Sequence, residues 1–144
     1  MADQYPRSPK VLLGGMMHLA RLIDKIRLRH TGLLQEYNYL TEGFDKYLLD
    51  FLQVDGVELE KRVLKGGTDN EILAWVRSKA KFLKEADLEQ WNEQLSTAAP
   101  KDEVVQARYD ARLKDIAAKR GVPVASLPRV KTWVDQIDLD EGRL

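Results

Sequence analysis

Apolar residues recur every three or four positions along most of this chain, and this spacing restricts its fold more than any other feature does. It places side chains on one face of an α-helix, whereas a half-buried β-strand needs alternation with period two. Met16, Leu19, Ile23 and Ile26 share one such face. No segment alternates with period two, and no Asn-Gly or Asp-Gly turn joins two β-rich runs. The sequence therefore predicts an all-α fold.

Capping residues and helix breakers divide this pattern into six or seven helices. Thr68 and Glu71 have the spacing of a capping box and mark the clearest helix start. Gly121 is predicted to end the helix before it. The segment Leu33–Leu40 is compatible with either a short helix or an irregular connection. We expect helices to begin near Met16, Phe44, Asp55, Thr68, Asp87, Asp102 and Ser126.

The length of 144 residues fits a single compact domain that buries a proper core. Residues 1–13 are predicted to form an extended arm, because Pro6 and Pro9 prevent an early helix. Leu52 and Val76 lie on predicted inner faces and are expected to be buried. Residues 138–144 are expected to fray.

Composition excludes several classes of protein. The chain has no cysteine, so it has neither a disulfide framework nor a thiol nucleophile. Its apolar runs are far shorter than the roughly 20 residues of a membrane-spanning helix. The N-terminus lacks the basic-then-apolar order of a secretory signal. These features predict a soluble cytoplasmic protein without a membrane partner.

The candidate polar site lies on the first predicted helix and in the segment after it. His18, Arg21 and Lys25 follow helical spacing and share one side, with Asp24 three residues from Arg21. A histidine beside an acid and a cation can transfer protons or hold an anion, although the same pattern also suits a solvated polar face. Tyr37 and Tyr39 complete the candidate site, since irregular segments often carry function.

Metal and nucleotide sites are not predicted. The two histidines, His18 and His30, are not spaced as metal ligands, and no dinucleotide-binding or P-loop glycine pattern occurs. We therefore expect no cofactor and no metal. A minor alternative is a helix-turn-helix over residues 116–134, but Pro128 and the zero formal net charge argue against nucleic-acid binding.

Several short motifs in residues 8–80 resemble a bacterial family described as domain of unknown function 5069. The resemblance implies a bacterial origin and no established activity, and it draws attention to Arg21, Asp24, Lys25 and Tyr37. The sequence departs from the family pattern at Ala20, where a proline is frequent. The matching residues are Leu22-Ile23-Asp24-Lys25-x-Arg27, Gly32, Tyr37, Tyr39, Phe44-Asp45-x-x-Leu48-Leu49-x-Phe51-Leu52 and Asp69-x-x-Ile72-Leu73-x-Trp75-Val76.

Charge and apolar patterning predict a homodimer. Residues 1–30 hold six basic and two acidic side chains, whereas residues 31–60 hold one basic and seven acidic ones. The first helix also has apolar residues off its main stripe, at Met17, Leu22 and Leu28, and so needs burial or a partner. The leading hypothesis is a homodimeric interaction or small-ligand-binding module. The alternative is a small enzyme or anion-binding protein that uses the candidate polar site.

Overall fold

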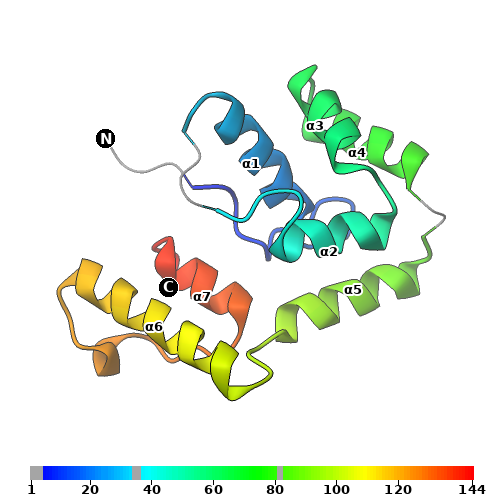
Figure 1. The fold of residues 1–144 in the computed structure, drawn as a ribbon. Coiled ribbons are helices and arrows are strands. Elements are labelled where there is room, and N and C mark those ends of the chain that lie inside the picture. The colour runs from blue at the N-terminus through cyan, green and yellow to red at the C-terminus, as the bar shows by residue number, and fades with distance from the viewer. Residues whose placement is uncertain (1–4, 34–36, 81–82) are drawn as a thin grey trace. The chain divides into compact units, whose positions relative to one another are not determined.

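A computed structural model describes residues 5–33, 37–80 and 83–144 (Figure 1). These residues form seven α-helices and one short 3-10 helix, with no strand among them. The predicted all-α fold of six or seven helices is therefore confirmed. The elements are α1 (Leu19–His30), α2 (Gly43–Leu52), α3 (Gly56–Leu64), α4 (Asp69–Lys79), α5 (Glu85–Thr97), α6 (Glu103–Arg120), η1 (Val124–Ser126) and α7 (Trp133–Asp140).

The chain divides into two compact units, Met1–Asn92 and Glu93–Leu144. The division falls within the residue range of α5, between Asn92 and Glu93. None of the helices in the described residues is both long and apolar enough to cross a membrane.

In the first unit, α3 packs against both α1 and α4 (Figure 1). The predicted stripe of α1 is buried. Leu52 and Val76 are both 0% exposed, as predicted. Burial of such side chains supplies most of the favourable free energy of folding. The other buried apolar residues of α2 to α4 are Leu48, Leu49, Leu59, Val63, Ile72 and Leu73.

The burial of α1 also removes one of the two reasons for the predicted homodimer, its apolar residues off the main stripe. Met17 and Leu22 are buried within the chain itself, and Leu28 is half-buried. These residues therefore need no second subunit to cover them. The dimer itself stays a prediction.

Helix α1 begins at Leu19, three residues later than predicted. His18 has a left-handed backbone with φ of 76°, and a right-handed helix cannot include that conformation. Before it, Gly14 and Gly15 also have positive φ, and their turn lets Leu13 and Met16 exchange backbone hydrogen bonds of 3.0 and 3.2 Å. Met16 belongs to this turn and still contributes to the core.

The segments around α1 partly match the predictions. Residues 5–12 contain neither helix nor strand, in keeping with an arm, although Pro6, Ser8 and Pro9 are buried; residues 1–4 of the predicted arm lie outside the described residues. Of the ambiguous segment 33–40, residues 37–40 are not helical and residues 34–36 lie outside the described residues.

Helix caps in the first unit follow the sequence closely. Asp55 accepts a hydrogen bond from the Glu58 amide at 3.1 Å, and Thr68 and Glu71 form the predicted capping box. Asp87 lies in the first turn of α5, which begins at Glu85, and not before the helix as predicted. Its carboxylate instead accepts from the amide of Lys84, at 2.8 Å, ahead of the helix.

In the second unit, Ile116 and Ala117 of α6 pack with Leu127 and Leu139. The predicted helix from Ser126 is wrong, because residues 127–132 are not helical and α7 starts after Thr132, whose hydroxyl caps it. Pro128 is the physical reason, since a proline pushes the preceding Leu127 into extended backbone, here with ψ of 150°.

Two further features of the second unit bear on the minor helix-turn-helix alternative and on the predicted tail. A helix-turn-helix over residues 116–134 is not formed, since such a motif joins its helices by a turn of about three or four residues and α7 begins at Trp133, well beyond Arg120. Contacts within the second unit also reach residues 138–144, whose fraying stays a prediction. Leu139 is 0% exposed and the Arg143 amide donates to the Asp138 carbonyl at 2.8 Å.

Candidate functional site

His18 stands at the start of the candidate site and combines three unusual properties. Its backbone is left-handed, its side chain is 1% exposed, and its ring packs edge-on against Phe44 with centroids 5.9 Å apart. Its amide donates to the Pro9 carbonyl at 2.9 Å. The local chain therefore fixes this imidazole inside the first unit.

Asp45, at the start of α2, organises the polar residues that face it. It is 0% exposed. One carboxylate oxygen, Oδ1, lies 2.6 Å from His18 Nε2 and 3.1 Å from Lys25 Nζ. The other oxygen accepts from the Leu40 amide at 3.1 Å, and Lys25 Nζ also donates to the Asn38 carbonyl at 3.0 Å. Helices α1 and α2 and the segment 38–40 are thus joined through buried polar contacts.

Asp45 was not among the predicted site residues, although the sequence holds a signal for it. It precedes Leu48, Leu49 and Leu52 by three, four and seven positions. It therefore belongs to the buried face of α2, where an unpaired carboxylate would be costly. A charged residue on an inner helical face indicates a buried partner.

Protonation states follow from this geometry. Burial alone would raise the pKa of Asp45, but the hydrogen bonds from His18 and Lys25 and the charge of Lys25 hold that pKa below its usual range. Burial lowers the pKa of His18, and the nearby charges of Lys25 and Arg21 add to the lowering against the opposing effect of Asp45. His18 is accordingly neutral at pH 7 and Asp45 ionised.

The neutral imidazole leaves one ring nitrogen available. With Asp45 ionised, His18 Nε2 carries the proton and donates it to the carboxylate, so Nδ1 is an acceptor. This buried Nδ1 has no hydrogen-bond partner among the described residues. Buried polar atoms are nearly always paired, so such an atom needs an explanation.

Arg21 and Tyr37 adjoin this group. The Arg21 side chain is 2% exposed, and its Nη1 donates to the carbonyls of Arg7 and Pro6 at 3.2 and 3.5 Å. The Tyr37 ring lies 5.4 Å from the Arg21 guanidinium and 5.7 Å from Lys25 Nζ. We call His18, Arg21, Lys25, Tyr37 and Asp45 the His18 cluster.

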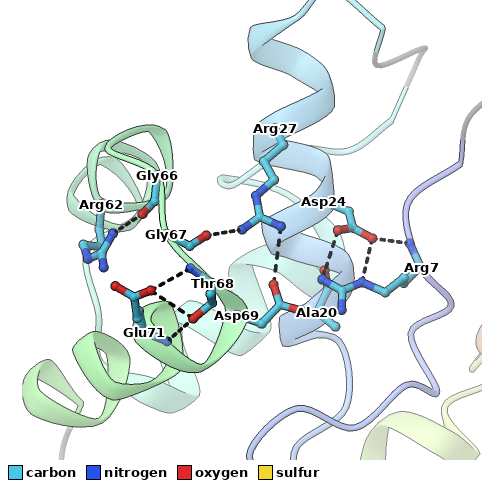
Figure 2. Close-up of polar contacts among 10 residues, drawn as sticks. All are labelled: Arg7, Ala20, Asp24, Arg27, Arg62, Gly66, Gly67, Thr68, Asp69 and Glu71. Atoms are coloured by element: carbon cyan, nitrogen blue, oxygen red, sulfur yellow. Dashed lines mark hydrogen bonds and ion pairs between the residues drawn. The ribbon is translucent and has the colours of Figure 1, made fainter.

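Two predicted site residues lie in other networks. Asp24 binds Arg7, which donates from its amide at 2.8 Å and from Nε and Nη2 at 2.9 and 3.0 Å (Figure 2). Tyr39 donates its hydroxyl hydrogen to Glu60 on α3, and Arg29 lies 4.4 Å from its ring. Burial and Glu60 together raise the pKa of Tyr39, so it stays protonated.

Arg7 connects α1 to α4 as well. Its Nη1 donates to Asp69 at 2.7 Å, and Arg27 Nη1 contacts the other oxygen of Asp69 at 3.3 Å (Figure 2). Hydrogen bonds from Arg7 lower the pKa of Asp69. We call Arg7, Asp24, Arg27 and Asp69 the Arg7 network. It was missed because no local pattern links residues so far apart in the chain.

Helix α5 holds the loop that leads into His18. Trp91 Nε1 donates to the Met17 carbonyl at 3.0 Å. The Asn92 side chain accepts from the Met17 amide at 2.9 Å and donates to the Gly15 carbonyl at 2.8 Å. The loop 13–17 is thereby fixed from outside, which keeps the His18 backbone in its left-handed conformation.

The chemistry open to the His18 cluster is hydrogen bonding and charge stabilisation. It offers one acceptor nitrogen, two cations and an aromatic face. Within the described ranges, no group of three or more histidine, cysteine or acidic residues is placed to hold a metal ion.

Comparison with known proteins gives a family but no activity. The family described as domain of unknown function (DUF5069) matches residues 3–143, nearly the whole chain. The chain belongs to this family, and the match extends well beyond residues 8–80, on which the resemblance rested. No curated protein is detectably similar to it.

Proposed function

We propose that this member of the DUF5069 family binds a small polar ligand at the His18 cluster, and that the ligand donates a hydrogen bond to His18 Nδ1. The observation that carries the proposal is this buried acceptor nitrogen, which has no partner among the described residues. Its ring neighbour, Nε2, is bound to Asp45 at 2.6 Å, so the imidazole is held in one orientation.

The cost of the arrangement supports a functional role. A left-handed backbone at a residue other than glycine costs about 1–3 kcal/mol and is concentrated at functional sites. Burying Asp45 and Lys25 removes two charges from water, and apolar residues of similar volume would serve stability as well or better. A site that combines strain, buried charge and a free acceptor is characteristic of binding and catalysis.

The chemistry of the cluster defines the class of ligand. A neutral His18 accepts at Nδ1, so the ligand must present an O–H or N–H group. Arg21 and Lys25 lie on the same side of α1 and favour a ligand that also carries negative charge. We therefore expect a hydroxyl- or amino-bearing carboxylate or phosphate.

A thermal-shift screen of such anions tests this proposal. A ligand that binds only the folded protein raises its melting temperature by mass action. The shift should disappear in His18→Phe and persist in His30→Phe, a matched control at the exposed histidine that ends α1. A ligand that stabilises both variants equally would place the binding site elsewhere.

A second candidate function is proton transfer by His18. The observation that favours it is the short His18–Asp45 hydrogen bond, because a carboxylate that orients a histidine is a recurrent general-base arrangement. Here Nδ1 would take a proton from the bound molecule while Nε2–H stays on Asp45. If His18 removes a carbon-bound proton and a deuteron from solvent returns to that carbon, NMR should show deuterium at a carbon of a screened ligand with the wild type and not with His18→Phe.

The homodimer remains a separate prediction, supported by the opposite charge of residues 1–30 and 31–60. Light scattering after size exclusion at micromolar concentration should give twice the monomer mass of 16.5 kDa. A mass of one chain, unchanged on concentration, would exclude it. Localisation in the cytoplasm likewise stays a prediction.

A further inference from the structure

We propose that the segment Pro6–Pro9 is a strap that closes the His18 cluster, and that Arg7 is the latch that holds the strap. The inference rests on the proposed ligand-binding function and concerns how that site is regulated. It would make access to the cluster depend on one charged side chain.

The strap lies against the start of α1 through its backbone carbonyls. The Pro9 carbonyl accepts from the His18 amide at 2.9 Å. The Arg7 and Pro6 carbonyls accept from Arg21 Nη1 at 3.2 and 3.5 Å. These carbonyls engage a donor of Arg21 that an anionic ligand would use. The strap therefore competes directly with such a ligand.

The latch is more accessible than the site it closes. Arg7 binds Asp24 on α1 at 2.9 Å and Asp69 on α4 at 2.7 Å. Figure 2 draws these residues as sticks. The Arg7 side chain is 34% exposed, whereas that of His18 is 1% exposed. Water, salt or a competing anion can thus reach the latch while the cluster is covered. Pro6 and Pro9 have no N–H groups of their own to hold the strap.

The His18 amide is a direct reporter of the strap, because its acceptor is the Pro9 carbonyl. Release of the strap exposes this amide, while the Leu22 amide keeps its acceptor, the His18 carbonyl. Hydrogen exchange followed by NMR separates such local opening from global unfolding. Carbethoxylation of neutral imidazoles by diethyl pyrocarbonate, read by mass spectrometry, reports independently on the His18 ring, with His30 as the internal exposed standard.

The test compares Arg7→Gln with Arg27→Gln, both made in the full chain. Arg27 also binds Asp69, but its other hydrogen bond goes to the Gly67 carbonyl rather than to α1, so it is a matched control. In Arg7→Gln, the His18 amide should exchange about tenfold faster and His18 should be modified faster by a similar factor. The Leu22 amide should keep its wild-type rate, and Arg27→Gln should behave as the wild type at His18.

Two outcomes would overturn the strap. One is a His18 amide and ring whose rates are unchanged in Arg7→Gln. The other is equal acceleration of the His18 and Leu22 amides, which would show that the segment opens only when α1 unfolds. Neither measurement uses the ligand, so failure of the strap and failure of the ligand screen are separate results.

Discussion

Helix α1 carries two charged networks on different sides, and they differ in their contact with water. In the His18 cluster, Asp45 is 0% exposed and its partners His18 and Lys25 are nearly so. In the Arg7 network, every side chain is between 20% and 40% exposed. Charge pairs of the second kind fix chain segments together at small cost, because water still solvates them. Charge pairs of the first kind are expensive to form, and their retention calls for a function.

The largest expected effect on stability comes from removing the acidic residue of each network. Asp45→Ala should lower the free energy of unfolding by about 3–5 kcal/mol, because it removes the carboxylate that balances the buried ammonium of Lys25. Asp69→Ala, in the Arg7 network, should cost only about 1 kcal/mol or less. Urea denaturation of both variants measures the difference. Equal losses of unfolding free energy would mean that burial does not distinguish the two networks.

A pH titration sharpens the contrast. The pKa of folded His18 is held below its ordinary value of 6.5, first by burial. Between these two pKa values, the unfolded chain therefore binds a proton at His18 and the folded protein does not. The stability that neutral His18 contributes to the folded protein is fully present above about pH 6.5. As pH falls below that value, the free energy of unfolding decreases by up to about 1.4 kcal/mol per pH unit until the folded pKa is reached.

The control for this titration is the second histidine. The slope attributed to His18 should vanish in His18→Phe and remain in His30→Phe, when stability is measured by urea denaturation between pH 7 and pH 5. A slope that survives in His18→Phe would mean that other groups cause the acid sensitivity.

The smallest effect concerns the Arg7 network and its dependence on salt. Arg7→Gln should cost about 1 kcal/mol of unfolding free energy at low ionic strength and less in 1 M salt, where exposed charges are screened. The cost of Asp45→Ala should change little with salt. Lys46→Gln, which breaks the exposed pair with Asp50, should leave stability unchanged at either ionic strength.

The sequence was a good guide to the helices because their information is local. Apolar spacing, the Thr68 capping box and Asp102 before α6 all act within a few residues. The predictions that failed also concern local structure, at positions where two sequence features favour different conformations or where no feature marks the conformation. Leu127, Val130, Val134 and Ile137 have helical spacing, yet Pro128 overrides it, and His18 adopts a left-handed backbone that no spacing indicates.

Only part of the candidate site could be predicted from the sequence. The structure brings His18, Arg21 and Lys25 together, because His18 directly precedes the helix that carries Arg21 and Lys25, and Tyr37 lies against two of them. Asp24 and Tyr39 were grouped with them but bind Arg7 and Glu60 instead. Asp45 and Arg7 come from segments whose approach to α1 depends on tertiary packing, which spacing along one helix does not encode.

The indole of Trp91 gives this protein a built-in optical signal. It is buried, stacks on Phe51 with ring centroids 5.1 Å apart, and donates its N–H to the loop that leads into His18. Trp75 and Trp133 are half-buried by comparison. Any rearrangement of the loop breaks the Trp91 hydrogen bond and alters the polarity around the indole. The emission of this one tryptophan, isolated in a chain with Phe at the other two positions, therefore follows the site without any label.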